Sequence, residues 1–346
     1  MSSSQDTKVL NLYPIDYPFE TLVSRVQADP PKLILDPEFQ RKYKWDKDGW
    51  ERASRFIESC LMRIPLPACY FAEKDDGTQL VIDGVQRITT IAKFFNDEFR
   101  LEGLTTFKEL EGKTFSEIGD YQNELESTTI RCIILRKENP KDLIQEIFSR
   151  LNQGAVQLSN QEIRHALYPG SLDVLLQELG KNESIQSFAL GESSTREKDS
   201  LENEEQVLRF FAMREDLSDY NDKLNKFLDE YMMENQNLSD EEIDDLRTLF
   251  NDSLSKCERV FDDDLFIDTN KERRRQSMVY YDLLMWSFSL HDEDFVNDKK
   301  DEIKEKFSEL CLLDDFQRTL SGGTQNKTSI IRRRNLWEEK LDEIDD

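Results

Sequence analysis

The chain has 346 residues, 37% of them hydrophobic and 34% charged, so it can fill a core and is not a wholly disordered chain. Its 46 Lys and Arg against 72 Asp and Glu give a net charge of −26. This excludes a general nucleic-acid coat, because phosphate binding needs a positive surface.

Cysteines, histidines and apolar runs exclude further classes of protein. The 5 cysteines are scattered and form no C-x-x-C pair, and there are only 2 histidines, which argues against a zinc ribbon or a His-rich metal site. No run approaches the roughly 18 apolar residues of a membrane span, and the first residues lack the pattern of a signal peptide. We expect a cytoplasmic protein with no membrane partner.

Residues 1–140 carry the pattern of a mixed α and β domain. Residues 32–39 read as a strand, and apolar residues at helical spacing predict a helix that ends before Pro65, because proline disfavours helix at the preceding residue. Two apolar runs, 68–73 and 79–82, flank an Asp-Asp-Gly turn and predict a β-hairpin. Residues 128–135 are a further β-rich run. The pattern predicts a small mixed sheet.

Residues 141–346 read as almost entirely helical. The patterns Ser159-x-x-Glu162 and Ser239-x-x-Glu242 are capping boxes that begin helices, and residues 191–200 are polar and read as a loop. Residues 30–100 hold 12 Lys/Arg and 12 Asp/Glu, whereas residues 201–270 hold 7 against 21, a net charge of −14. This contrast predicts two domains with different surfaces, 1–140 and 141–346, and hence an α+β fold followed by an all-α domain.

The most informative stretch is Leu80–Asn96, LVIDGVQRITTIAKFFN. A buried strand, a tight Asp-Gly turn and a helix follow one another there. The free N–H groups and the positive dipole end of such a helix form an anion site. A glycine lets a ligand approach the backbone, an arginine offers phosphate two N–H groups, a threonine offers a hydroxyl, and a glutamine can contact a base, a ribose or a water. The residues placed to do so are Gly84, Gln86, Arg87, Thr89 and Thr90.

A plainer interpretation of the same stretch is a charged turn. Arg87 then pairs with Asp83, and Thr89 is an ordinary helix residue. Short glycine motifs are weak signals, and no Walker A pattern is present.

Two carboxylates end neighbouring strands of the predicted hairpin. Glu73 and Asp83 there suggest a site for a Mg²⁺ ion that bridges phosphates, or for a water that they orient. The alternative is that Asp83 caps the following helix and Glu73 pairs with a nearby basic residue.

Several ordered blocks of the sequence together resemble one known family, the N-terminal domains of GmrSD-type restriction endonucleases. That family resembles the ParB/sulfiredoxin superfamily, so the resemblance implies a ParB/sulfiredoxin-like N-terminal domain. The blocks are Phe39-Gln40-Arg41 with Trp45, Ile64–Pro67, Val81–Thr90, Phe148–Gly170, Leu208–Ala212 and Phe227–Met232.

The resemblance implies nucleotide binding, and often hydrolysis, by an Asp-Gly-Gln-Gln-Arg motif. Here the motif reads Asp83-Gly84-Val85-Gln86-Arg87, which implies catalytic roles for Asp83, Gln86 and Arg87. Val85 departs from the pattern and puts hydrolysis or nucleotide preference in doubt. It also excludes sulfiredoxin chemistry, which needs a cysteine at this turn.

Other family blocks supply further candidates. In the family's arrangement Arg41 lies beside the Asp-Gly turn and is a second phosphate contact; the alternative is a surface arginine among lysines. Arg150 and Asn152 are not explained by capping and are expected to complete the nucleotide site from the helical side. His165 near a helix end is read as a packed or dipole-compensating histidine.

The expected function is a nucleotide-binding, Mg²⁺-dependent, NTP-hydrolysing regulatory subunit of a restriction-like or anti-phage system. The chain shows no His–Asn–His constellation, so DNA cleavage is expected of a separate nuclease partner. The alternative is a non-hydrolytic switch that senses nucleotide or modified DNA and controls such a nuclease or a DNA-modification-sensing protein. Any DNA contact is expected only at local basic patches, Arg273–Arg275 or Arg332–Arg334.

Overall fold

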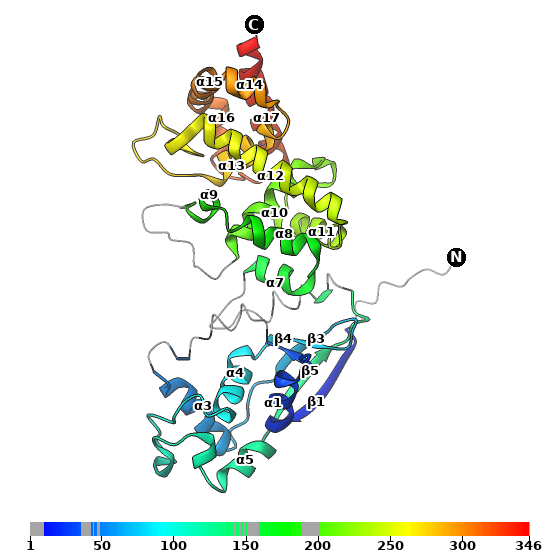
Figure 1. Cartoon of the computed structure of the whole chain (residues 1–346), viewed down its shortest axis with the longest axis vertical. Helices are drawn as coiled ribbons and strands as arrows, with labels where there is room; N and C mark the ends of the chain where they lie inside the picture. Colours follow the sequence, from blue (N-terminus) through cyan, green and yellow to red (C-terminus); the bar gives the residue numbers. More distant parts are fainter. Residues whose placement is uncertain are drawn as a thin grey trace, which may run out of the picture. The chain divides into compact units, whose positions relative to one another are not determined.

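The structure is a computed structural model that describes residues 10–35, 49–140, 159–188 and 201–345, together with Tyr43, Trp45, Asp46, Leu143, Ile144, Ile147 and Arg150. The chain divides into two compact units, Met1–Gln157 and Leu158–Asp346. We call them the N-terminal unit and the helical unit (Figure 1). The first contains a mixed sheet with helices, and the described part of the second is all helical, which confirms the predicted fold class.

The N-terminal unit is built on a five-stranded sheet of order β1-β5-β3-β4-β2. Antiparallel pairs join β1 to β5 and β3 to β4, whereas β3 with β5 and β2 with β4 are parallel. The predicted hairpin is therefore confirmed as β3 and β4. The strands are β1 Leu12–Pro18, β2 Leu33–Ile34, β3 Cys69–Glu73, β4 Gln79–Asp83 and β5 Thr129–Leu135.

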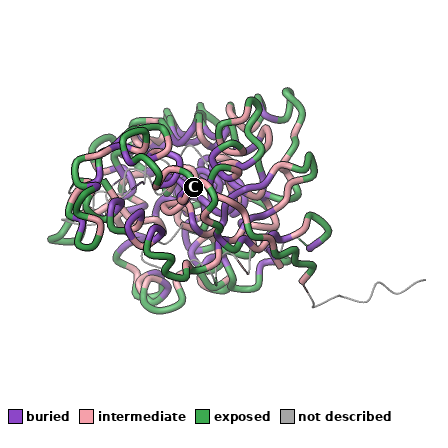
Figure 2. The backbone as a smooth tube through the Cα atoms, turned by 90° about the horizontal axis from the view of Figure 1, so that it is seen from below, coloured by how far each residue is buried: buried purple, intermediate pink, exposed green. Residues whose placement is uncertain are grey.

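Helices α1 (Phe19–Gln27), α3 (Glu51–Leu61), α4 (Val85–Phe95) and α5 (Tyr121–Ser127) accompany the sheet. Alternate residues of β3, β4 and β5 join the buried residues of these helices in one hydrophobic core, as the period of two in a strand requires. In Figure 2 the exposed residues form outer turns of the tube and the buried stretches run inside.

Two elements were absent from the sequence-based prediction and one is shorter than predicted. Strand β1 contains Pro14 and Pro18, which argue against a strand unless it lies at a sheet edge, and β1 is an edge strand. Helix α1 follows directly at Phe19. The strand predicted over 32–39 is described only as Leu33–Ile34, and residues 36–40 lie outside the described residues.

The helical unit packs its helices around a second hydrophobic core. Both predicted capping boxes are confirmed, since the Ser159 and Ser239 side chains accept from the N–H groups of Glu162 and Glu242. Among the described helices, none combines the length and the hydrophobicity needed to cross a bilayer. The helices are α7 Asn160–Leu167, α8 Ser171–Leu179, α9 Glu183–Gln186, α10 Glu202–Arg214, α11 Leu224–Glu234, α12 Asp240–Phe261, α13 Met278–Phe288, α14 Glu293–Asp298, α15 Lys300–Leu312, α16 Asp314–Thr319 and α17 Lys327–Asp345.

A buried arginine joins three helices of this unit. The Arg164 side chain on α7 is fully buried, with Nη1 2.8 Å from Glu205 Oε2 on α10 and Nε 2.7 Å from Asp229 Oδ1 on α11. Gln161 Oε1 accepts a further hydrogen bond at 3.1 Å. Because an unpaired buried charge is costly, these partners hold the arginine and the three helices together.

Candidate functional site

The predicted strand–turn–helix unit is present. Strand β4 ends at Asp83, Gly84 takes a left-handed conformation, and α4 begins at Val85. Buried Ile88, Ile91 and Phe94 fix α4 in the core. The N-cap residue of α4 is Gly84, which has no side chain to accept from the N–H groups of the first turn. The positive dipole end of a helix with such a start favours an anion.

Position 84 requires a glycine for two reasons, its left-handed backbone conformation and the closeness of the Cys69 thiol. Its φ is +103°, and a Cβ placed there would lie 2.3 Å from Sγ of Cys69 on β3. The Cys69 thiol is fully buried. The absent side chain thus makes room for Cys69, in addition to permitting the left-handed turn.

Arg87 is held by three oxygen atoms. Its Nη2 lies 2.7 Å from Asp83 Oδ2 and donates to the Ala68 carbonyl at 3.2 Å, and its Nη1 donates to the Pro67 carbonyl. The ion pair with Asp83 that the plainer interpretation predicted is therefore present. The arginine also connects two sequence blocks, Ile64–Pro67 and Val81–Thr90, which sequence reasoning had treated separately.

The structure does not bring Glu73 and Asp83 together. In the antiparallel hairpin Asp83 faces Tyr70, whereas Glu73 faces Gln79. The two residues therefore lie at opposite ends of the hairpin, with their backbone positions about 10 Å apart along β3 at about 3.3 Å per residue. Glu73 instead forms an ion pair with Arg136 Nε at 3.1 Å. Among the described residues no three His, Cys, Asp or Glu side chains gather into a metal-binding group.

Tyr43 is a residue of the site region that sequence reasoning missed. Its hydroxyl lies 2.7 Å from Thr90 Oγ1, and Thr90 donates to the Gln86 carbonyl at 2.7 Å, so the Tyr43 hydroxyl is the donor to Thr90. Burial, partly offset by the Thr90 hydrogen bond, raises the pKa of Tyr43 to about 12. The Tyr43 side chain thereby contacts α4 one turn beyond the N-terminus of this helix.

The signal for Tyr43 was its position between Arg41 and Trp45 in the first family block. Arg41 itself lies outside the described residues, as does Asn152. Arg150 is an exposed residue in helical conformation. His165 places Nδ1 2.7 Å from Asp173 Oδ2, which agrees with its interpretation as a packed histidine.

Thr89 is buried, with 4% of its surface exposed, and within the described chain its hydroxyl has no hydrogen-bond partner. Thr89→Val is expected to leave any nucleotide affinity unchanged and to raise the free energy of unfolding by up to about 1 kcal/mol, because valine removes an unsatisfied buried hydroxyl. Chemical denaturation measures the stability, and thermal shift with nucleotide measures binding. A loss of binding without a loss of stability would contradict this and place Thr89 in the site.

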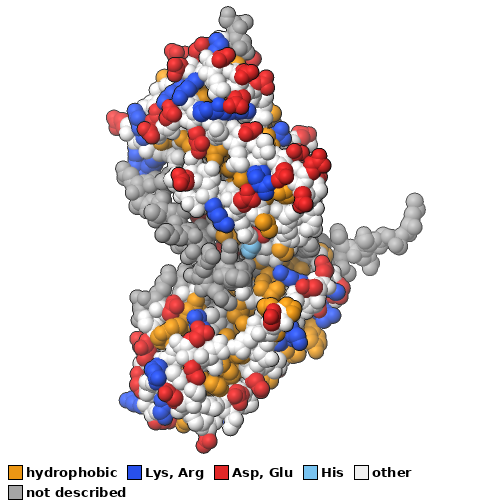
Figure 3. All heavy atoms as spheres, viewed as in Figure 1, with side chains coloured by type: hydrophobic (Ala, Val, Ile, Leu, Met, Phe, Trp, Pro, Cys, Tyr) orange, Lys and Arg blue, Asp and Glu red, His pale blue; other side chains and the backbone are white. Residues whose placement is uncertain are grey.

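The arginines of the Arg332–Arg334 run bind acceptors within the helical unit. Arg333 donates to the carbonyls of Thr319 and Thr324, and burial lowers its pKa to about 10. Arg334 donates to the Met213 carbonyl. In the view of Figure 3, basic and acidic side chains are interspersed over the helical unit, as expected for a surface of paired charges.

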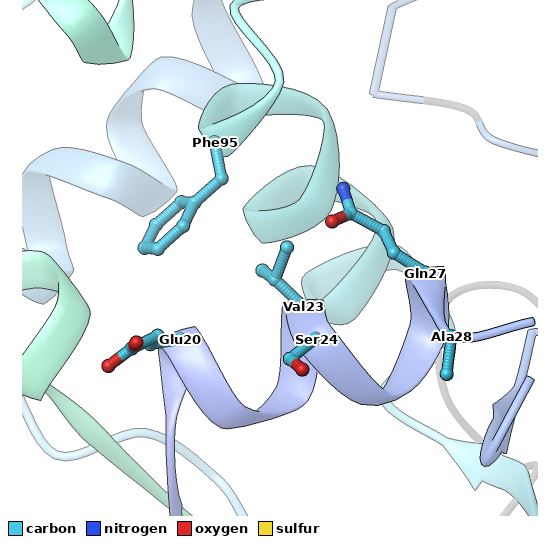
Figure 4. A pocket seen from close by; sticks show the side chains of 6 residues that line it. All are labelled: Glu20, Val23, Ser24, Gln27, Ala28 and Phe95. Atoms are coloured by element: carbon cyan, nitrogen blue, oxygen red, sulfur yellow. The ribbon is translucent and has the colours of Figure 1, made fainter.

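A pocket lies away from the Asp83–Arg87 turn. It has a volume of 440 Å³ and is lined by five residues of α1 and its C-terminal end, together with Phe95. Figure 4 shows Val23 of α1 and Phe95 of α4 facing this space. Phe95 is the last residue of α4, so the pocket is at the opposite end of the helix from the turn.

Comparison with known proteins identifies the region that contains this site. No curated protein and no solved structure matches the chain, so the predicted likeness to ParB and sulfiredoxin folds stays a prediction. A family model does match, from the core residue Phe19 that begins α1 to Pro169 just after α7. Residues 19–169 are thus similar to the N-terminal domain of GmrSD restriction endonucleases.

Proposed function

We propose that the N-terminal unit binds a nucleoside triphosphate at the Asp83–Arg87 turn and hydrolyses it as the regulatory part of a restriction or anti-phage system. The observation that carries this proposal is the Arg87 guanidinium, which main-chain carbonyls hold at the N-terminus of α4. An arginine fork and a helix N-terminus are two groups that bind phosphate strongly.

In this proposal each residue of the turn has a distinct role. Arg87 and the first N–H groups of α4 bind phosphate oxygens, and Gln86 contacts the nucleotide or orients the attacking water. The Asp83 carboxylate, with 44% of its side chain exposed, fits a Mg²⁺ ion, which in nucleotide sites takes one or two carboxylates together with phosphate oxygens. Such an ion supplies positive charge that offsets the charge of the triphosphate. Arg41, Arg150 and Asn152 are proposed as further contacts to the nucleotide.

The proposed partner is a separate nuclease, or a protein that senses modified DNA. This proposal rests on the match of residues 19–169 to a restriction-enzyme domain family and on the acidic charge of the chain. Because phosphate binding needs a positive surface, DNA contact is proposed only at local basic patches, if the protein meets DNA directly.

The test is phosphate release from ATP, CTP, GTP and UTP with Mg²⁺, with and without DNA, comparing wild type with Arg87→Ala. Arg131→Ala is the matched control, because Arg131 forms an exposed ion pair with Asp16 elsewhere on the sheet. We expect release from at least one nucleotide, retained in the control and reduced at least about a hundredfold in Arg87→Ala, as on losing a charged hydrogen-bond partner of phosphate. Equal release by a folded Arg87→Ala would contradict the assignment.

A non-hydrolytic switch is the second candidate, and Val85 favours it. This residue packs against the hydrophobic core of the N-terminal unit, where it cannot offer the polar group that the family motif has at this position. If the protein is such a switch, one nucleotide should stabilise the wild type against heat without phosphate release, and Arg87→Ala should lose this stabilisation.

A further inference from the structure

The Asp83–Arg87 ion pair holds a negatively charged carboxylate against Arg87, the residue proposed to bind phosphate. Nη2 of Arg87 is 2.7 Å from Oδ2 of Asp83, and the Arg87 side chain is 14% exposed. A carboxylate and a phosphate oxygen carry like charge and accept from the same N–H groups. Asp83 therefore competes with phosphate for Arg87.

The position of Arg87 does not depend on Asp83 alone. The carbonyl oxygens of Pro67 and Ala68 also accept from the guanidinium, and both belong to the main chain just before β3. Asp83, in contrast, is a half-exposed side chain at the end of β4. Loss of the Asp83 charge is therefore expected to leave the guanidinium in place and to increase its attraction for an anion.

We propose that Asp83 is an electrostatic gate that occupies Arg87 in the metal-free protein and releases it when a divalent cation binds the carboxylate. This inference rests on the proposed function and deepens it, because it makes binding of the cation and of the polyphosphate cooperative. Linkage requires that each ligand raises the affinity for the other by the same factor.

The second oxygen of Asp83 gives the cation a point of entry. Oδ2 accepts from Arg87, and among the described residues no donor contacts Oδ1. A cation can therefore bind Oδ1 before the ion pair separates. Hard divalent cations such as Mg²⁺ prefer carboxylate oxygens.

The test uses inorganic tripolyphosphate as the probe and calorimetric titration of the full chain in chelator. Asp83→Asn keeps the shape of the side chain and removes its charge. We expect it to bind metal-free tripolyphosphate about fivefold more tightly than wild type, since a half-exposed carboxylate no longer competes with phosphate for the Arg87 guanidinium. Asp16→Asn is the matched control, because Asp16 forms an ion pair with Arg131 at 2.5 Å on the same sheet, and its affinity should equal that of wild type.

Two further variants distinguish failure of the gate from failure of the proposed function. In Asp83→Asn with Arg87→Ala the gain should vanish, and a gain that persists overturns the gate because it arises elsewhere. Asp83→Ser should reproduce the gain if Asp83→Asn does not fold. Equal metal-free affinity of folded Asp83 variants and wild type overturns the gate even where Mg²⁺–nucleotide binding depends on Arg87. Absence of Mg²⁺–nucleotide binding in wild type overturns the proposed function itself.

Discussion

Replacing Arg164 with methionine is expected to lower the free energy of unfolding of the helical unit by about 3–5 kcal/mol. Methionine matches the length of the side chain but leaves Glu205 and Asp229 facing one another without the cation that both contact. The Arg164 side chain is fully buried, and its partners Asp229 and Glu205 are 17% and 34% exposed, so water replaces the guanidinium only in part, least of all at Asp229. Loss of one partner of a buried ion pair has this magnitude because the remaining charge is stranded.

The measurement is denaturant unfolding of the wild type and the variant, followed by far-UV circular dichroism. Arg247→Met is the matched control, since Arg247 contacts Glu178 at 2.8 Å but is 32% exposed, and an exposed pair contributes less than about 1 kcal/mol. A loss in Arg164→Met no larger than that of the control would show that the network does not hold the three helices together.

Gly84→Ala is the second substitution with a large expected effect, a loss of about 2–5 kcal/mol from the N-terminal unit. The left-handed backbone penalises any Cβ, and the new methyl would lie 2.3 Å from the Cys69 thiol. The two penalties have different causes and can be measured separately.

Gly77→Ala provides the separation. Its φ is +81°, close to the conformation at Gly84, but nothing lies within 4 Å of the added Cβ. The free energy of unfolding of Gly77→Ala should therefore fall only by the cost of the left-handed backbone, about 1–2 kcal/mol. The double variant Gly84→Ala with Cys69→Ala should regain part of the loss through a favourable coupling. Equal losses in Gly84→Ala and Gly77→Ala would show that contact with Cys69 does not constrain the turn.

Local signals made much of the fold predictable. The β3–β4 hairpin follows from two short apolar runs around an Asp-Asp-Gly turn, and helices α7 and α12 begin directly after the serines of their capping boxes. The strand, turn and helix from β4 to α4 were read from their hydrophobic spacing. In each case the residues that decide the structure are neighbours in the sequence.

Contacts between distant segments were not predictable in the same way. That Pro67 and Ala68 hold Arg87, and that Tyr43 donates to Thr90, depends on how separate segments pack. Glu73 and Asp83 each end a strand, but in an antiparallel pair the ends of two consecutive strands lie at opposite ends of the hairpin. A shared site for Glu73 and Asp83 was one of two alternatives, and strand direction rules it out, whereas the pairing of Glu73 with a nearby basic residue agrees with its contact to Arg136.

The direction of the β3–β4 hairpin has a practical consequence for labelling. Its connecting turn at Asp75–Gly77 lies at the end away from Asp83, and Gly77 faces open space. A fluorescent dye or a short peptide tag attached there would be joined to β3 and β4, the two strands of the hairpin that ends at Asp83. It would not contact the Asp83–Arg87 turn, because that turn lies at the other end of the hairpin. Exposed turns of this kind accept insertions most readily, so this turn is the natural attachment point for an optical reporter of the N-terminal unit.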